Sequence, residues 1–462
     1  MAMQNMNAQT EKAAEISAFL SKTEPLLERA GVSARESFEL YDMYDAAARS
    51  AAANITEIDP ELRVEICDRK DRILDRIVDL TPRISYEKHS IFTLALHGEG
   101  CRRWSNADLL KDCGLTGYTL AKETGASPVM CYGTQPSDYP YLSYMPGMEM
   151  LYDGSSTDMA HVYYELLNDS YTKMDTLILY GMHLKTPRFL GAYRKLRPDG
   201  KVYCGLDMNS FWMKKITWDS EYVKKFAKQC DVIATSCRTI RDALNRSPKV
   251  NFPCCWIANG FFNATGSHII ADPAKKDNII LSVGRISKGV KNIAELLNAF
   301  ALISNIMPDW KIRLVGPVNQ KFQSYMDSFF NTRPDLKNRV ILTGEIIDKE
   351  ELYKEYARAK IYALTSVTEG GTPNVYAEAL HHGCMFVTSD IDGADDITNF
   401  GALGIKYKKG DFRALAGALV RMSQKADISA FQKHIPLALA YAAEHYDWNR
   451  TAKKIAFMLY KN

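Results

Sequence analysis

The sequence predicts an α/β protein with two doubly wound parallel sheets in tandem, preceded by a helical extension. The chain has 462 residues, more than one hydrophobic core usually organises, so at least two domains are expected. Its first part shows the periodicity of amphipathic helices, and two series of short apolar runs alternating with amphipathic stretches follow. Such alternation is typical of a parallel sheet covered by helices on both faces.

The composition excludes several classes of protein. Hydrophobic residues make up 46% and charged residues 24%, which is typical of a globular rather than a disordered chain. The formal charge of +3 gives no strong basic field, so no nucleic-acid partner is predicted. The polar start of the chain and the lack of a long apolar run predict a cytoplasmic protein, either free or at the inner face of a membrane.

Residues 1–88 form the predicted helical extension. Stretches such as ELRVEICDRKDRILDRIVDL place apolar residues three or four positions apart, which gives each helix one apolar face. These residues leave open whether the extension recognises a substrate, docks to a partner or forms a homo- or hetero-oligomer.

The first doubly wound domain is predicted over residues 89–262. Its expected strands are short apolar runs that end in Gly, Asp or Ser, residues that commonly follow a strand. They are IFTLALHG (91–98), SPVMCYG (127–133), DTLILYG (175–181), KVYCGLD (201–207) and DVIATS (231–236).

The second doubly wound domain is predicted over residues 263–427. The strands expected in this second domain are NIILSVG (278–284), WKIRLVG (310–316), RVILTG (339–344), AKIYALTS (359–366) and CMFVTSD (384–390). Residues 428–462 are expected to form helices that pack back on the first domain. Open parallel sheets bind ligands at the carboxyl ends of their strands, so the loops that follow these runs are the place to look for functional residues.

Two of these loops suggest an anion site. In the first, Arg285, Lys288 and Lys291 precede a helix, where Arg285 would bind a diphosphate in bidentate fashion and Lys291 would add a point charge. Simple solvation of these cations is the alternative. In the second, Gly370 and Gly371 allow close approach to a ligand.

The second loop runs into a helix whose first N–H groups, around Thr372, Asn374 and Val375, would bind an anion. Glu369 lies before that helix start and Glu378 lies inside the helix. Carboxylates in these places suit sugar hydroxyls better than phosphate. The alternative is an acid that interacts with the helix dipole and a solvated helical glutamate.

The motifs of this half resemble, in order and spacing, the C-terminal domain of family-4 retaining glycosyltransferases of the GT-B fold. The resemblance covers residues 278–422. It rests on VGRISKGVKNIAELLNAFALI, WKIRLVG, RVILTGEI, AKIYALTSVTEGGTPNVYAEALHHG, VTSDIDGADDI and GDFRALAGAL. The resemblance implies a nucleotide-sugar donor domain in this half, with two Rossmann-like domains overall.

The resemblance also implies roles for single residues. Arg285 and Lys291 would bind the donor diphosphate. The family's lysine follows its arginine by five or six positions, which favours Lys291, six positions after Arg285, over the alternative Lys288, three positions after it. Glu378 would hold the ribose and Glu369 would contact the transferred sugar. One departure is that eight residues separate these two glutamates, where the family usually has seven.

The base and the acceptor involve further residues. By the resemblance, main-chain groups near Glu345 and Ile346 would meet the base, and His183 would lie near the reacting sugar unless it is structural. The Gly98-Glu-Gly100 loop would face the donor or the acceptor, or form a plain turn. Asp207 would contact the acceptor or cap a helix.

A basic and aromatic segment offers another contact surface. Lysines 214, 215, 224, 225 and 228 are interleaved with aromatic residues such as Trp212, which suits an anionic membrane or a lipid-linked acceptor; a solvated helix face is the alternative. Asp390-Ile-Asp392 has the DxD pattern of a metal site, but it matches a turn of the family, so no metal is predicted.

The predicted function is therefore transfer of a sugar, with retention, from a nucleoside diphosphate sugar to a hydroxyl of a glycan, a lipid-linked saccharide or a protein glycan. No cofactor is predicted beyond the donor substrate, a UDP-sugar or, alternatively, a GDP-sugar. Two other readings stay open: an epimerase or phosphorylase of the same architecture, and a non-catalytic nucleotide-sugar binder or partner subunit, because fold alone does not settle function.

Overall fold

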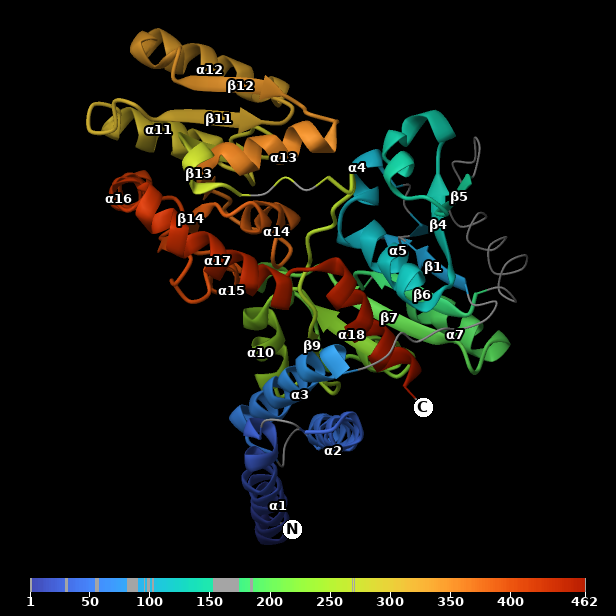
Figure 1. Ribbon diagram of the computed structural model, residues 1–462. Coiled ribbons are helices and arrows are strands. Elements are labelled where there is room, and N and C mark those ends of the chain that lie inside the picture. The colour runs from blue at the N-terminus through green and yellow to red at the C-terminus, as the bar shows by residue number, and fades with distance from the viewer. Residues whose placement is uncertain are drawn as a thin grey trace. The chain divides into compact units, whose positions relative to one another are not determined.

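The computed structural model describes residues 2–29, 32–54, 58–80, 90–94, 96–97, 100–101, 104–152, 174–182, 186–267, 269 and 271–461. The chain divides into two compact units (Figure 1). Unit 1 consists of Met1–Ala258 together with Trp448–Asn462, and unit 2 is the continuous segment Asn259–Asp447.

Unit 1 begins with three long helices, α1 (Ala2–Glu28), α2 (Ala34–Ala53) and α3 (Pro60–Leu80). A capping box between Ser33 and Glu36 fixes the start of α2. The apolar faces of these helices share one core with the last helix, α18 (Trp448–Tyr460), where the rings of Tyr41 and Phe457 lie 5.1 Å apart. The predicted helical extension therefore packs as part of unit 1.

The main sheet of unit 1 is parallel, in the order β5-β4-β1-β6-β7-β8-β9. Its strands are β1 (Ser90–Leu94), β4 (Ser127–Gly133), β5 (Glu149–Tyr152), β6 (Thr176–Tyr180), β7 (Lys201–Leu206), β8 (Val232–Thr235) and β9 (Cys255–Trp256). A small antiparallel pair is formed by β2 (Leu96–His97) and β3 (Gly100–Cys101). The strand order reverses between β1 and β6, which is the usual ligand-binding point of such a sheet.

Among the described residues of unit 1, the other helices are α4 (Asn106–Leu109), α5 (Asp112–Thr124), α7 (Thr186–Leu196), α8 (Ser210–Met213), α9 (Glu221–Ala227) and α10 (Arg238–Arg246), with the 3₁₀ turns η1 (Pro136–Asp138) and η2 (Pro140–Tyr144). Strands β6 and β8 are buried almost throughout, as expected of strands covered on both faces.

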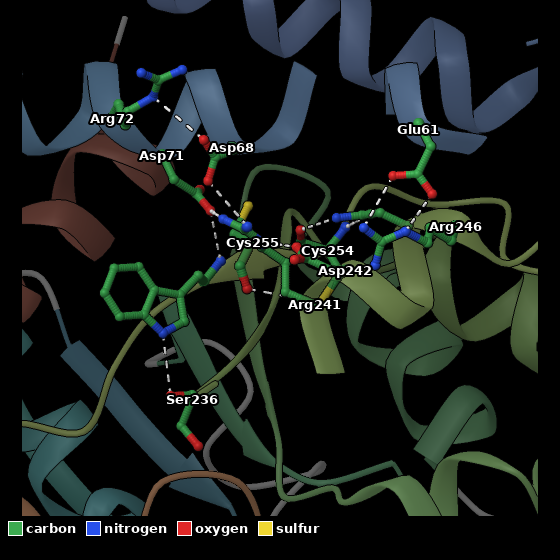
Figure 2. A network of polar contacts seen from close by, with 12 residues as sticks. Glu61, Asp68, Asp71, Arg72, Ser236, Arg241, Asp242, Arg246, Cys254 and Cys255 are labelled. Atoms are coloured by element: carbon green, nitrogen blue, oxygen red, sulfur yellow. Dashed lines mark hydrogen bonds and ion pairs between the residues drawn. The ribbon is translucent and has the colours of Figure 1, made fainter. Parts of the chain in front are cut away.

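A buried polar network joins α3 to α10 and β9 (Figure 2). Arg241 of α10, only 2% exposed, donates to Asp71 Oδ2 at 2.8 Å and to Asp68 Oδ1 at 3.2 Å. The backbone N–H of Trp256 donates to the same Asp71 oxygen at 3.2 Å. Asp71 therefore ties the helical extension to the last strand of the sheet.

Unit 2 holds a second parallel sheet, in the order β12-β11-β10-β13-β14-β15. Its strands are β10 (Asp277–Val283), β11 (Lys311–Val315), β12 (Val340–Gly344), β13 (Ala359–Leu364), β14 (Met385–Ser389) and β15 (Gly404–Tyr407). Its helices are α11 (Ile293–Ile303), α12 (Gln320–Thr332), α13 (Lys349–Arg358), α14 (Asn374–His381), α15 (Ala394–Ile397), α16 (Phe412–Gln424) and α17 (Ile428–His445), with the 3₁₀ turns η4 (Pro273–Lys275) and η5 (Pro334–Leu336). Two parallel sheets and a helical N-terminal region confirm the predicted fold class.

The carboxyl ends of the unit 2 strands lie along one edge of the sheet. The strand order reverses between β10 and β13, so the loops after these two strands, 284–292 and 365–373, are neighbours at the switch point. Both predicted anion-binding loops therefore meet at one place. The loop after β11 also comes close to the first of them, since a Cβ on Gly316 would lie 2.1 Å from the carbonyl oxygen of Gly284.

Candidate functional site

The loop after β10 carries the predicted cations. Gly284 adopts a φ of +132°, a conformation that residues with a side chain rarely adopt, and turns the chain out of the strand. Arg285 and Lys288 are exposed, whereas Lys291 is partly buried. Ile286 N–H donates to the carbonyl of Pro317 at 2.9 Å, which anchors the loop to the segment after β11. Arg285 is thus displayed from a fixed backbone.

Three contacts fasten this loop to the loop after β13. Val367 N–H donates to the carbonyl of Val290 at 2.9 Å, and Thr365 Oγ1 donates to the carbonyl of Lys291 at 2.8 Å. Lys291 Nζ lies 2.5 Å from Glu369 Oε1, with side-chain exposures of 23% and 14%. The structure therefore brings Lys291 and Glu369 together, while Lys288 remains exposed.

Glu369 has a second polar partner. Ser366 Oγ donates to Glu369 Oε1 at 2.5 Å, and Ser389 Oγ at the end of β14 donates to the carbonyl of Ser366 at 2.6 Å. The carboxylate is consequently held by residues from two neighbouring strand ends. Ser366 was not among the predicted site residues, although its place at a strand end three residues before Glu369 was a usable signal.

The start of α14 lies directly after this loop. Gly371 has a φ of +90°, and Pro373 precedes the helix in an extended conformation. Thr372 is buried, and its carbonyl accepts from Asn259 Nδ2 at 2.9 Å. The first N–H groups of a helix, here those of Asn374 and Val375, point away from its own carbonyls, so this fixed start suits an anion.

Glu378 lies one turn further along α14. Its Oε2 accepts from the Tyr356 hydroxyl at 2.6 Å, and its Oε1 lies 3.7 Å from Lys349 Nζ. Burial first, and then the charge of Glu378, raises the pKa of Tyr356 well above its usual value, so the phenol stays protonated and donates. Tyr356 and Lys349 were not among the predicted site residues, and their spacing of seven residues puts them on one face of α13.

The segment predicted to meet a base follows β12. Gly344 has a φ of +74°, and its carbonyl accepts from Gly316 N–H at 2.8 Å. Glu345 is exposed and Ile346 is partly buried. Asp348 then caps α13 by accepting from Glu350 N–H at 2.8 Å. These turns place residues 345 and 346 at the same sheet edge as the glutamates.

The Asp390-Ile-Asp392 pattern lies at the end of β14. The Asp390 carboxylate accepts from Lys409 N–H at 2.9 Å, so it holds the turn after β15. Among the described residues, no cluster of three or more His, Cys, Asp or Glu side chains is arranged to hold a metal ion.

The predicted residues of unit 1 are placed less fully. His183 and Gly98 lie outside the described residues, and Gly100 of β3 pairs with His97 of β2. Asp207 follows β7 with an exposed side chain. Burial, and then the carboxylates of Asp112 and Asp207, raise the pKa of Tyr180 at the neighbouring end of β6.

The basic and aromatic segment after β7 displays two rings. Phe211 and Trp212 of α8 are 57% and 55% exposed, and Lys215 Nζ lies 4.1 Å from the centre of the Phe211 ring. Asn209 Oδ1 caps the helix by accepting from Trp212 N–H at 3.0 Å. In the part of the chain that the structure describes, no helix is long and apolar enough to cross a membrane.

Comparison with known proteins finds a family match in the second half of the chain. Residues 277–425 match the model of the family described as "Glycosyl transferases group 1". A segment of 127 residues is 33% identical to N-acetylgalactosamine-N,N'-diacetylbacillosaminyl-diphospho-undecaprenol 4-alpha-N-acetylgalactosaminyltransferase of Campylobacter jejuni. That match covers 27% of this chain and 31% of the relative, so it spans about a third of the relative's length.

Solved structures share the architecture. The Anabaena protein HepE in complex with UDP is similar over 79% of this chain and 98% of its own, with 16% identity and a TM-score of 0.56. Sucrose-phosphate synthase from Thermosynechococcus elongatus is similar over 80% of this chain and 97% of its own, with 16% identity and a TM-score of 0.57. Residues 277–425 therefore match a glycosyltransferase family, and the chain shares the two-sheet GT-B fold of these structures.

Proposed function

We propose that this protein transfers a sugar, with retention of anomeric configuration, from a nucleoside diphosphate sugar to a hydroxyl group of an acceptor. The observation that carries the proposal is the cluster at the switch point of unit 2. There, the Lys291–Glu369 pair lies before the start of α14, and Glu378 lies one turn inside that helix. The cations and the helix N–H groups suit the diphosphate of such a donor, and the two carboxylates suit the hydroxyl groups of its ribose and its sugar.

In this proposal the donor lies along the carboxyl edge of the unit 2 sheet. Arg285 and Lys291, with Lys288 nearby, and the N–H groups of residues 371, 372, 374 and 375 bind the diphosphate. Glu378 accepts from the ribose hydroxyls, and main-chain groups of Glu345 and Ile346 meet the base. The UDP bound to the similar Anabaena protein supports a UDP-sugar, with a GDP-sugar as the alternative.

The proposed catalysis depends on stabilising the negative charge that develops on the departing diphosphate. As the bond between the anomeric carbon and the diphosphate oxygen breaks, its electron pair leaves with the diphosphate, and negative charge grows there. Arg285, Lys291 and the helix start stabilise that charge more in the transition state than in the bound donor, which is the condition for catalysis. These groups supply the needed positive charge, so we propose a metal-independent reaction. Glu369 contacts the transferred sugar.

Retention then requires the acceptor hydroxyl to attack on the face from which the diphosphate leaves. The hydroxyl oxygen forms the new bond to the anomeric carbon, and its proton passes to the departing diphosphate. No carboxylate is needed as the nucleophile that a retaining glycosidase uses.

We assign the acceptor to the sheet domain of unit 1, predicted as residues 89–262, and the donor to residues 263–427. Asp207, His183 and the loop of Gly98 and Gly100 are the proposed acceptor residues. The Campylobacter relative acts on a substrate carried by diphospho-undecaprenol, which supports a lipid-linked saccharide as the acceptor class. The exposed rings of Phe211 and Trp212 would suit peripheral contact with the inner membrane face.

Three rival functions would give different results in an assay of donor turnover. A GT-B-like epimerase would act without an acceptor, and a phosphorylase would require inorganic phosphate in place of a hydroxyl acceptor. A non-catalytic binder or partner subunit would bind the donor and leave it intact. Turnover of the donor with and without phosphate or acceptor separates all of these.

The first experiment is thermal melting of the purified protein with UDP-, GDP-, ADP-, CMP- and dTDP-sugars. A ligand at 100 times its dissociation constant adds about 2.7 kcal/mol of stability. We expect one base to raise the melting temperature, and Arg285→Ala to abolish that rise. The exposed Lys337→Ala variant, in a turn after η5, serves as the matched loss of a cation. Absence of any shift for every sugar nucleotide would contradict the proposed function.

A further inference from the structure

Two residues of α13 hold the carboxylate of Glu378 from behind. Tyr356 donates to Oε2 at 2.6 Å, and Lys349 Nζ lies 3.7 Å from Oε1. The two residues are separated by two helical turns, so both side chains reach the same neighbour on α14. Each oxygen of Glu378 therefore has its own partner in the adjacent helix.

The surroundings leave this cluster little freedom. The Tyr356 ring is fully buried and stacks on His382, with ring centres 5.8 Å apart and an angle of 20°. His382 Nδ1 in turn donates to the backbone carbonyl of Glu378 at 2.7 Å. His382 thus holds the backbone of Glu378, while Tyr356 and Lys349 hold its side chain.

The carboxylate keeps acceptor positions beyond those that these two contacts use. An ionised carboxylate offers about four acceptor positions, of which Tyr356 takes one and Lys349 approaches another. Two hydroxyl donors on neighbouring carbons, as in a ribose, would fill the remainder. Glu378 lies four residues after the start of α14, roughly 6 Å along the helix axis from the proposed diphosphate position. Lys349 also lies three residues after Ile346, the end of the segment proposed to meet the base.

We propose that Tyr356 and Lys349 are positioning residues that set Glu378 to bind the 2′,3′-diol of the donor, so that the protein discriminates ribonucleotides from 2′-deoxyribonucleotides. This inference rests on the proposed function, because it takes the donor to be a nucleoside diphosphate sugar. It narrows the substrate class to ribonucleoside diphosphate sugars and disfavours dTDP-sugars. Without the phenol, the carboxylate would rotate and one of its two bonds to the diol would be lost.

The test measures dissociation constants by calorimetry for UDP and dUDP, GDP and dGDP, ADP and dADP, and CDP and dCDP. The pair whose ribonucleotide has the lowest dissociation constant is then used to compare the wild-type protein with its variants. We expect the wild-type protein to prefer the ribonucleotide by about tenfold or more, the effect of one good hydrogen bond to a charged group. In Tyr356→Phe, the ribonucleotide should bind about tenfold more weakly while the deoxynucleotide changes by less than about twofold.

The matched control is Tyr353→Phe. Tyr353 lies on the same helix, and its hydroxyl donates to the carbonyl of Phe262 at 3.0 Å rather than to Glu378. This variant should keep the wild-type ratio of the two affinities. Circular dichroism and the melting temperature report whether each variant folds. If Tyr356→Phe fails to fold, Lys349→Met carries the same measurement and should lower the ratio of affinities as well.

The outcomes separate the two proposals. Equal loss of affinity for both nucleotides, or an unchanged ratio, would overturn the positioning role and leave the proposed function standing. A wild-type protein that binds no nucleotide would overturn the proposed function and this inference with it. A ratio that collapses in Tyr356→Phe and persists in Tyr353→Phe supports the inference.

Discussion

The ammonium nitrogen of Lys291 lies 2.5 Å from a carboxylate oxygen of Glu369, although the residues are 78 positions apart in the chain. One residue comes from the loop after β10 and the other from the loop after β13, the two strands that flank the switch point. Because both side chains are mostly buried, removing either one leaves the other charge poorly solvated. The pair keeps both groups in place before any ligand arrives.

The first prediction concerns this pair. Lys291→Met removes the charge proposed to stabilise the departing diphosphate, so we expect the turnover number to fall by about 10²–10³-fold, the usual effect of losing one such group. Lys337→Met is the control, since it removes an exposed lysine from a turn outside the proposed donor site. Its turnover should stay within about threefold of wild type, because an exposed cation contributes little. Steady-state transfer assays measure both, and equal losses would contradict the assignment of Lys291.

The second prediction concerns the stability of unit 1. Arg241→Ala leaves Asp71 buried without its main cation, so we expect a loss of about 3–5 kcal/mol in the free energy of unfolding. Arg246→Ala provides the contrast, because Arg246 and Glu61 form an ion pair with side chains 45% and 69% exposed. That variant should lose less than about 1 kcal/mol. Urea unfolding followed by circular dichroism gives both values, and similar losses would refute the structural importance of the buried network.

The third prediction is an acid sensitivity of unit 2. Burial lowers the pKa of His382 to about 4, and it also lowers the pKa values of His381 and His434. The folded state then binds fewer protons than the unfolded state below the usual histidine pKa of about 6.5. Stability is therefore complete above about pH 6.5 and declines as the pH falls toward 4, by roughly 3 kcal/mol for His382 alone.

Calorimetric melting between pH 7.5 and pH 4.5 checks this expectation. His382→Asn keeps a donor near the carbonyl of Glu378 but does not titrate, so its melting temperature should depend less steeply on pH. The variant will also lose the ring stacked on Tyr356 and start from a lower stability. A slope identical to that of wild type would show that His382 does not contribute to the acid sensitivity.

The fourth prediction concerns the exposed rings of unit 1. With Phe211 and Trp212 on the surface beside Lys215, we expect binding to vesicles that contain anionic phosphatidylglycerol and weaker binding to neutral ones. The double change Phe211→Ser and Trp212→Ser should abolish most of that binding. Phe400→Ser is the matched control, since Phe400 is 70% exposed and belongs to unit 2. Flotation assays measure it, and undiminished binding of the double variant would exclude these rings as the contact.

The sequence was sufficient for much of the fold, because the central strands are long and apolar. The strand predicted over residues 278–284 is β10 (Asp277–Val283), and the strand predicted over residues 359–366 is β13 (Ala359–Leu364). The strands β5, β9 and β15 were missed, since two to four residues carry too little pattern.

In the candidate site, too, local features could be predicted from the sequence and contacts between distant segments could not. Residues within one loop, such as Glu369 near the start of α14, follow from local spacing. The contact between Tyr356 and Glu378 does not, because it depends on how two helices pack side by side. The contact between Asp71 and Arg241 likewise joins residues 170 positions apart, which no local periodicity reveals.

The return of the chain from unit 2 to unit 1 affects how the protein is made. Unit 2 is one continuous segment, so it can fold on the ribosome as soon as residue 447 has emerged. Unit 1 must wait for α18, whose Phe457 and Tyr460 are buried in its core and whose Tyr460 hydroxyl lies 2.7 Å from Thr176 Oγ1. The half of the chain synthesised first is therefore the last to be completed, and during that interval it is the part most exposed to chaperones and aggregation.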